Sequence, residues 1–163
     1  MSHRIAPSQP LRQKGARTKR VKPSGPGQRD PRQIDKAHKG RIAQLPCTAC
    51  LSMPVEVAHV RYSFPAGGKR ATGKAEKPSD KWCIPLCPWC HRLAPDAQHN
   101  SNEREWWEKR HINPLDICER LYKVSQSEKM TDTDKIMVMT AIVRGTHAMA
   151  QGERAALGEK AND

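Results

Sequence analysis

The chain has 163 residues and a formal net charge of +12, with 29 Lys and Arg residues against 17 Asp and Glu residues. Aromatic residues make up only 4% of it, so the folded part should be small and held together by a metal or by disulfides. No apolar run is long enough to cross a membrane and no apolar signal segment is evident, so we expect no membrane partner and a cytoplasmic location.

The first part of the sequence is strongly basic. Residues 1–46 contain 12 Lys and Arg residues, only two acidic residues, six prolines and no aromatic residue. This composition predicts a disordered basic arm over residues 1–41, with Arg17, Lys19 and Arg20 in its densest stretch. A solubilising tail and a nuclear-import segment are alternatives. We expect these three residues to contact DNA, because each neutralised phosphate releases counterions.

Short elements follow the arm. Residues 30–46 have room for a short helix before Pro46, and a strand is expected within residues 55–62, where Val and Tyr alternate with polar residues. Residues 65–80 are rich in Gly, Pro and Lys and predict a loop. A second extended segment is expected over residues 81–87, followed by a turn that starts a helix.

The remaining sequence predicts helices. Residues 101–111 form one, with Asn100 and Ser101 as cap candidates and Glu103 at a capping-box distance from Asn100. Asn113 and Pro114 begin another helix, and residues 132–151 form a third with a broad apolar face. Two short strands with these helices indicate an α+β fold.

Two C-x2-C pairs, Cys47 with Cys50 and Cys87 with Cys90, are the strongest motif. In a reducing compartment such pairs favour a metal over disulfides, and four thiolates match a closed tetrahedral structural zinc site. Replacement of one ligand by Cys83 is the alternative. Cys118 falls within a predicted helix and is expected to be a small buried apolar residue.

Two histidines accompany the cysteine pairs. His59 lies in the predicted first strand and His91 directly follows Cys90, in the stretch KPSDKWCIPLCPWCH. This order resembles that of the HNH (ββα-metal) nucleases, in particular prophage proteins related to the recombination-enhancement nucleases. The motif-bearing part covers about a third of the chain. The resemblance implies that His59 is the general base and that His91 binds a catalytic divalent cation, Mg²⁺, Mn²⁺ or Zn²⁺.

The motif departs from the family at two places. Ala58 stands where the family often has an acidic metal ligand, and we expect His99 to replace that ligand. The middle asparagine of the family motif is absent between His59 and His99. Asp80 is expected to take over the orientation of the base, which makes His59 and Asp80 the catalytic pair.

Several further residues have two interpretations. Arg61, Lys69 and Arg70 are expected to contact the DNA backbone, although a basic loop is also common as a merely solvated segment. Trp106 and Trp107 are expected to anchor their helix against the second cysteine pair, with base stacking as the alternative.

The complete expectation is a zinc-stabilised ββα-metal core over residues 42–125, preceded by the basic arm and followed by a C-terminal helix and tail over residues 126–163. The expected function is DNA cleavage of low sequence specificity by a phage or prophage endonuclease in the cytoplasm of a bacterial host, with recombination proteins as possible partners. The alternatives are a non-catalytic zinc module that binds DNA and an adaptor that binds other proteins.

Overall fold

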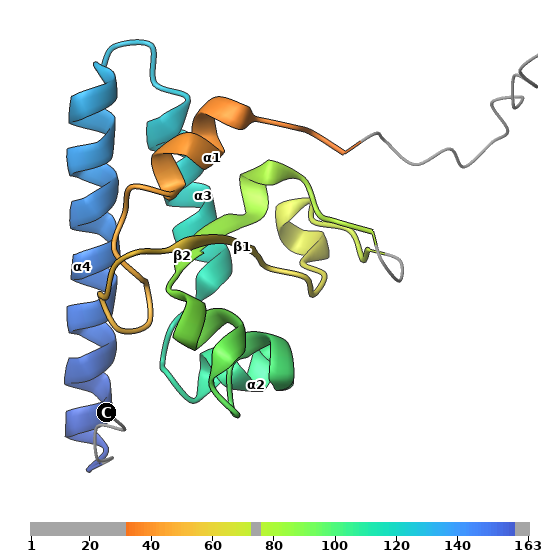
Figure 1. The fold of residues 1–163 in the computed structure, drawn as a ribbon, viewed down its shortest axis with the longest axis vertical. Helices are drawn as coiled ribbons and strands as arrows, with labels where there is room; N and C mark the ends of the chain where they lie inside the picture. Colours follow the sequence, from red (N-terminus) through yellow and green to blue (C-terminus); the bar gives the residue numbers. More distant parts are fainter. Residues whose placement is uncertain (1–31, 73–75, 159–163) are drawn as a thin grey trace, which may run out of the picture. The chain divides into compact units, whose positions relative to one another are not determined.

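The structure is a computed structural model that describes residues 32–72 and 76–158. Within these ranges, four α-helices and one two-stranded antiparallel sheet make up the α+β fold that the sequence predicts (Figure 1). None of the helices in the described ranges combines the length and the apolar character that a membrane span requires.

Helix α1 (Lys36–Ile42) begins at Asp35, whose carboxylate accepts a hydrogen bond of 2.8 Å from the amide of His38. Ile42 at its end is fully buried and contacts the core. The boundary expected at residue 41 therefore falls inside a packed helix, which corrects the arm prediction for residues 32–41. The short helix predicted within residues 30–46 is confirmed, and only the end of the arm was placed too far along the sequence. The rest of the predicted arm, including Arg17, Lys19 and Arg20, lies outside the described residues.

Strands β1 (Glu56–His59) and β2 (Cys83–Leu86) pair with Glu56 opposite Leu86 and His59 opposite Cys83. Both strands lie within the segments predicted from the sequence. All four residues of β2 are buried, because this strand packs against both α1 and α3. The sheet therefore fixes the residues of β1 with respect to the core.

The connection between the strands, predicted as a loop, contains a short bridge and helical turns. Phe64 and Lys69 form an isolated bridge around a turn in which Gly68 has a φ of 73°, a conformation that favours glycine. Short helical turns are formed by Pro65–Gly67, Asp80–Trp82, Trp89–Leu93 and Gln98–Asn100. The helix expected after Cys90 is thus limited to two such turns.

Helix α2 (Glu103–Glu108) is capped by Asn102 and not by Asn100 or Ser101. The side-chain amide of Asn100 instead donates to the carbonyls of Arg92 and Ala94, at 3.2 and 2.8 Å. The capping-box spacing from Asn100 therefore gave the wrong cap. Helix α3 (Pro114–Ser125) begins where predicted, with Asn113 accepting hydrogen bonds from two amides of the first turn.

Helix α4 (Asp132–Ala156) extends five residues beyond the predicted end and runs alongside α3 (Figure 1). It begins with a capping box formed by Thr131 and Asp134. Met139 and Val143 on its inner face are fully buried in the same core as the strands. The C-terminal helix therefore packs as part of the same unit as the cysteine motif.

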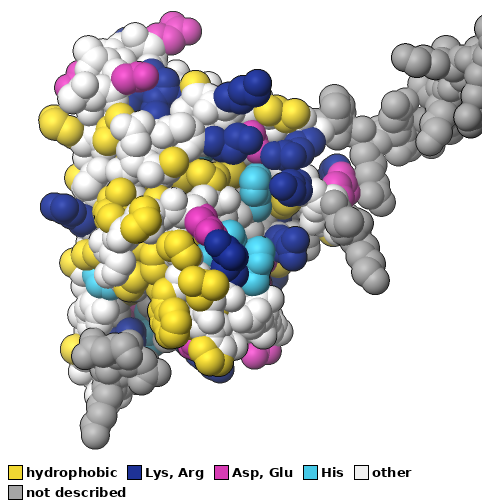
Figure 2. Space-filling model, viewed as in Figure 1, with side chains coloured by type: hydrophobic (Ala, Val, Ile, Leu, Met, Phe, Trp, Pro, Cys, Tyr) yellow, Lys and Arg dark blue, Asp and Glu magenta, His cyan; other side chains and the backbone are white. Residues whose placement is uncertain are grey.

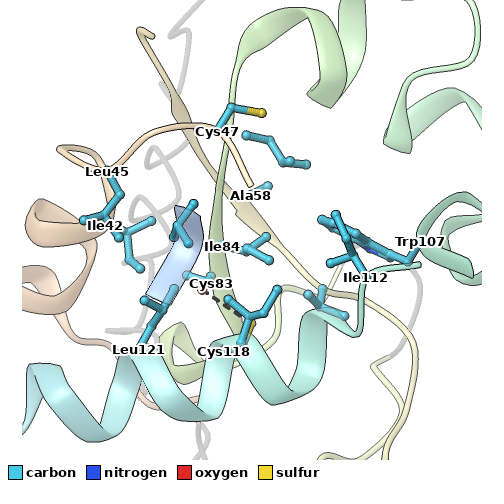
Figure 3. Close-up of a cluster of buried hydrophobic side chains, with 14 of the residues drawn as sticks. Ile42, Leu45, Cys47, Ala58, Cys83, Ile84, Trp107, Ile112, Cys118 and Leu121 are labelled. Atoms are coloured by element: carbon cyan, nitrogen blue, oxygen red, sulfur yellow. Dashed lines mark hydrogen bonds between the residues drawn. The ribbon is translucent and has the colours of Figure 1, made fainter. Parts of the chain in front are cut away.

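Figure 3 shows how the core joins segments that are distant in the sequence. Side chains from α1 and the loop after it, from both strands, and from α3 meet around Ile84 in β2. Cys118 is fully buried, as predicted, and its thiol donates to the carbonyl of Cys83 at 3.4 Å. The core positions β2, and β2 in turn positions the site residues at both of its ends.

Candidate functional site

The four cysteines of the two C-x2-C pairs converge on one point. Their sulfur atoms all lie within 4.8 Å of one another, and Cys50 Sγ lies 3.6 Å from the sulfurs of both Cys87 and Cys90. A tetrahedral zinc with Zn–S bonds of about 2.3 Å separates its sulfurs by roughly 3.8 Å. The quartet of Cys47, Cys50, Cys87 and Cys90 can therefore hold a structural metal such as zinc.

Backbone hydrogen bonds form the turns that direct these sulfurs. The amide of Leu51 donates to the carbonyl of Cys47 at 2.8 Å, and the amide of Cys90 donates to Cys87 Sγ at 3.4 Å. The amide of Thr48 donates to the carbonyl of Pro85 at 2.9 Å, which fastens the first turn to β2. A metal in the quartet would therefore clamp the end of β2 to the turn that precedes β1.

Cys83 belongs to a different group from the quartet. It is fully buried and stands opposite His59 in the sheet. Its sulfur lies within 4.8 Å of ligand atoms of His59 and Asp80, and it is absent from the four-cysteine group. This geometry favours the original quartet over the alternative in which Cys83 replaces one of its members.

His59 and Asp80, predicted as the catalytic pair, are in contact. His59 Nε2 lies 3.2 Å from Asp80 Oδ1, and the side chain of His59 is 16% exposed while that of Asp80 is completely buried. The strand places His59, and the helical turn Asp80–Trp82 places Asp80 one turn before β2.

Two cations hold Asp80 in its buried position. Arg32 donates to Asp80 Oδ1, and Lys39 Nζ lies 3.2 Å from Oδ2. The amide of Asp35 also donates to Oδ2, at 3.0 Å. Burial alone would raise the pKa of Asp80, but these hydrogen bonds and the one from His59 hold it well below its ordinary value. Asp80 is therefore a carboxylate at neutral pH.

The same environment keeps His59 neutral. Burial lowers the pKa of His59, and the hydrogen bond to Asp80 only partly opposes this effect. Because an ionised carboxylate can only accept, Asp80 selects the His59 tautomer that carries its proton on Nε2. The other nitrogen, Nδ1, is then left as a proton acceptor.

His91 and His99, both predicted as ligands of a catalytic cation, lie side by side. Their ring centroids are 4.3 Å apart in an edge-on arrangement, and His91 is buried while His99 is exposed. The turn that follows Cys90 places His91, and the turn Gln98–Asn100 brings back His99. Partial desolvation of its ring beside His91, followed by positive charge on His91, lowers the pKa of His99.

Glu56 is a site residue that the sequence analysis missed. Its carboxylate accepts a hydrogen bond of 2.6 Å from His91 Nδ1 and contacts the guanidinium of Arg92 at 2.7 Å. The hydrogen bond from Arg92, and then that from His91, lowers the pKa of Glu56 to about 2. Glu56 lies two residues before Ala58, on the same side of the strand, and this spacing is the signal that could have found it.

The residues expected to contact DNA differ in their surroundings. Arg61 is exposed, and its backbone amide donates to Glu103 at 2.9 Å. Arg70 forms an ion pair with Glu76. Lys69 is only 2% exposed, and its ammonium donates to the carbonyl of Tyr62, so the expectation of a DNA contact is corrected: Lys69 is a structural residue in this loop.

Trp106 and Trp107 are 2% and 1% exposed and pack edge to face, with 4.7 Å between their ring centroids. This burial fits the anchoring interpretation and leaves no ring face for a base to stack on. The guanidinium of Arg110 covers the Trp106 ring at 3.8 Å.

These three histidines therefore form two groups, each with its own carboxylate: His59 with Asp80, and His91 and His99 with Glu56. Among the residues described, no hydrogen bond joins one group to the other. On the face shown in Figure 2, histidine side chains lie among Lys and Arg side chains. Comparisons with protein-family models, with curated proteins and with solved structures found no match.

Proposed function

We propose that this protein is a metal-dependent endonuclease of the HNH type, which hydrolyses DNA phosphodiester bonds with little sequence specificity. The observation that carries the proposal is the contact between a neutral strand histidine, His59, and a buried carboxylate, Asp80. A neutral imidazole with one nitrogen fixed by a carboxylate is the arrangement that general bases use near neutral pH.

His59 acts as the base in this proposal. Its Nδ1 removes a proton from a water molecule as that water attacks the phosphorus atom. Asp80 holds the ring in one tautomer and stabilises the positive charge that develops on it, and its own proton affinity is too low for it to take the proton.

His91 and His99 are the proposed cation ligands. Glu56 accepts a hydrogen bond from Nδ1 of His91, which leaves the lone pair of Nε2 available to bind a cation. This pattern of carboxylate, histidine and cation is common in metal sites. A divalent cation held there would stabilise the charge that develops on the phosphate and the leaving oxygen. Imidazole nitrogens suit Zn²⁺, whereas Mg²⁺ and Mn²⁺ prefer oxygen and would keep several water ligands at such a site.

The test is incubation of the purified protein with supercoiled plasmid DNA and a panel of divalent cations. Nicking should require a cation, and His59→Ala should reduce the rate by roughly 100-fold to 10,000-fold, because a general base is lost. His91→Ala should raise the cation concentration required. His147→Ala is the matched control, because this histidine of α4 belongs to neither group and its Nε2 lies 3.4 Å from the side chain of Gln151.

Two outcomes would count against the proposal. If His59→Ala nicks at the wild-type rate, the activity comes from a contaminant or from another base. If His91→Ala loses the structural zinc, His91 belongs to the cysteine site and the cation site is misassigned.

A second candidate function is a non-catalytic zinc module that binds DNA. The observation in its favour is that Asp80 is completely buried and shared with Arg32 and Lys39, as expected of an ion-pair network that only fastens α1 to the sheet. DNA binding without nicking under every cation would select this candidate. His59→Ala would then lower stability and leave the affinity for DNA unchanged.

A further inference from the structure

His59, Asp80 and Cys83 form a group of mixed ligands separate from the four cysteines. One ligand atom from each lies within 4.8 Å of the others. His59 and Cys83 are directly opposite each other in the sheet, and Asp80 starts the helical turn that leads into Cys83. Strand pairing and a three-residue turn thus fix the backbone positions of all three residues.

We propose that these three residues are a second metal site, specific for zinc and similar thiophilic cations, and that its occupation switches off His59. The metal binding is independent of the function proposed above. Only its inhibitory consequence rests on that function, because a histidine bound to a cation cannot also accept a proton from water.

The distances between the three ligand atoms, all within 4.8 Å, would need only small side-chain movements to suit zinc. Bonds of about 2.0 to 2.3 Å to nitrogen, oxygen and sulfur place tetrahedral ligand atoms roughly 3.3 to 3.8 Å apart. The separation of His59 Nε2 and Asp80 Oδ1 is already 3.2 Å. The cation would replace the proton that His59 Nε2 donates to Asp80, and the ring would take up a proton from solvent on Nδ1 instead, so that neither nitrogen of His59 could act as a base. Three protein ligands leave the fourth position to water, as in zinc sites that are not closed by a fourth protein ligand.

The donor set also determines which cation binds. A thiolate selects zinc, cobalt or cadmium and is avoided by Mg²⁺ and Ca²⁺, which prefer oxygen. Burial raises the pKa of Cys83 to about 12, so the free site carries a thiol. On binding, the S–H bond breaks, the sulfur–metal bond forms and the proton passes to solvent, so that affinity should increase with pH.

The charges around Asp80 can accommodate the cation. Arg32 and Lys39 reach Asp80 from side chains that are 28% and 33% exposed, so either can turn towards water when a cation replaces it. A divalent cation with one carboxylate and one thiolate is neutral overall. Binding exchanges one thiol proton for a divalent cation, so the charge of the three ligands with the metal changes from −1 to zero, and Asp80 no longer needs both Arg32 and Lys39 as counter-charges.

Cobalt titration tests the binding without any assay of DNA cleavage. Co²⁺ bound by thiolate gives a charge-transfer band in the near ultraviolet. With the four-cysteine site already filled with zinc, wild-type protein should show this band for one further equivalent of Co²⁺. Cys83→Ala should abolish it, whereas Cys118→Ala, which removes a neighbouring buried thiol, should retain it. His99→Ala should also retain it, which separates this site from the pair formed by His91 and His99.

Nicking assays test the consequence. With Mn²⁺ as the catalytic cation, added Zn²⁺ should inhibit the wild type, and in Cys83→Ala the zinc concentration for half-inhibition should rise at least about tenfold. Each variant is compared with its own rate without added zinc.

Each result has a definite meaning. If wild-type protein gives no thiolate band with the further equivalent of Co²⁺, the second site is overturned, and this measurement does not depend on how the variants fold. If the band is seen but no DNA is nicked under any cation, the site stands and the proposed nuclease function fails. If the band is seen and zinc does not inhibit nicking, the switch is overturned.

Discussion

His38 is a completely buried histidine of α1 whose ring nitrogens have no hydrogen-bond partner among the residues described. Its ring packs edge-on against Tyr122, with 5.1 Å between the centroids. Burial lowers the pKa of His38 from 6.5 to about 4, although Asp35 nearby opposes this shift. The folded protein therefore keeps His38 neutral where the unfolded chain would protonate it.

This difference predicts a pH dependence of stability. Below pH 6.5 the unfolded chain binds a proton at His38, and the folded chain does so only near pH 4. The contribution of His38 to stability should therefore fall as the pH decreases from 6.5 to about 4 and level off below that, with a total effect on the order of 3 kcal/mol. Urea denaturation at several pH values measures it.

His38→Leu should remove most of this dependence, because leucine has a similar volume and does not titrate. The wild type and the variant share the same cysteines, so their difference at each pH reports on His38 alone. His147→Leu is the control and should keep the wild-type slope. A His38→Leu slope equal to that of the wild type would show that His38 is solvated or paired.

At the scale of elements, the two cysteine turns meet directly after the end of β2. Cys90→Ser should lose about one bound zinc per chain and lower the melting temperature strongly, because the metal contributes directly to the folding of such a small core. Removal of zinc by a chelator should have the same effect on the wild type. Elemental analysis and circular dichroism measure both quantities.

Cys118→Ser is the matched control, because it changes a buried thiol outside the quartet. It should retain the zinc whatever its effect on stability. A Cys90→Ser protein that keeps a full equivalent of zinc and stays folded would contradict the structural role of the quartet.

The stability of helix α4 depends on the hydrogen bonds of its first turn. Thr131 Oγ1 accepts a hydrogen bond of 3.2 Å from the amide of Asp134, and the Asp134 carboxylate accepts one of 3.3 Å from the amide of Thr131. Thr131→Ala should lower the free energy of unfolding by about 1 kcal/mol, because an amide at the helix start loses its acceptor. Thr133→Ala, an exposed position in the same turn, should have almost no effect. Equal effects of the two changes would show that the capping box does not contribute.

At the scale of the whole molecule, residues 1–30 carry eight Lys and Arg residues and one Asp. Their deletion should weaken binding to duplex DNA and flatten the plot of log affinity against log salt concentration by roughly 0.9 for each phosphate that is no longer neutralised. The zinc content and the melting temperature should not change. An unchanged slope would show that this segment does not contact DNA.

A longer deletion, of residues 1–41, has a different expected result. It also removes Arg32 and Lys39, which pair with the buried carboxylate of Asp80, and most of α1. A buried carboxylate left without its cations is costly, commonly by about 3 to 5 kcal/mol. The longer deletion should therefore destabilise the fold, and the comparison of the two separates DNA binding from stability.

The parts of the site that the sequence could predict are those fixed by local spacing. Two C-x2-C pairs indicated the cysteine quartet, and the strand pattern around His59 gave the position of β1. Glu56 was not predicted, because its contact with His91 spans 35 residues and depends on how the turn after Cys90 is oriented. Lys69 was misjudged for a similar reason, since only the bridge between Phe64 and Lys69 turns its side chain inwards.

The hydrogen bond from Thr48 to the carbonyl of Pro85 has a consequence for self-association. Pro85 lies in the middle of β2 and has no amide proton to donate, and its carbonyl is already occupied by Thr48 at 2.9 Å. An open strand edge normally offers both groups to a strand from another molecule, which is a common route to aggregation. The outer edge of β2 offers neither group at its centre, so this two-stranded sheet is protected on that side from growing into a larger one.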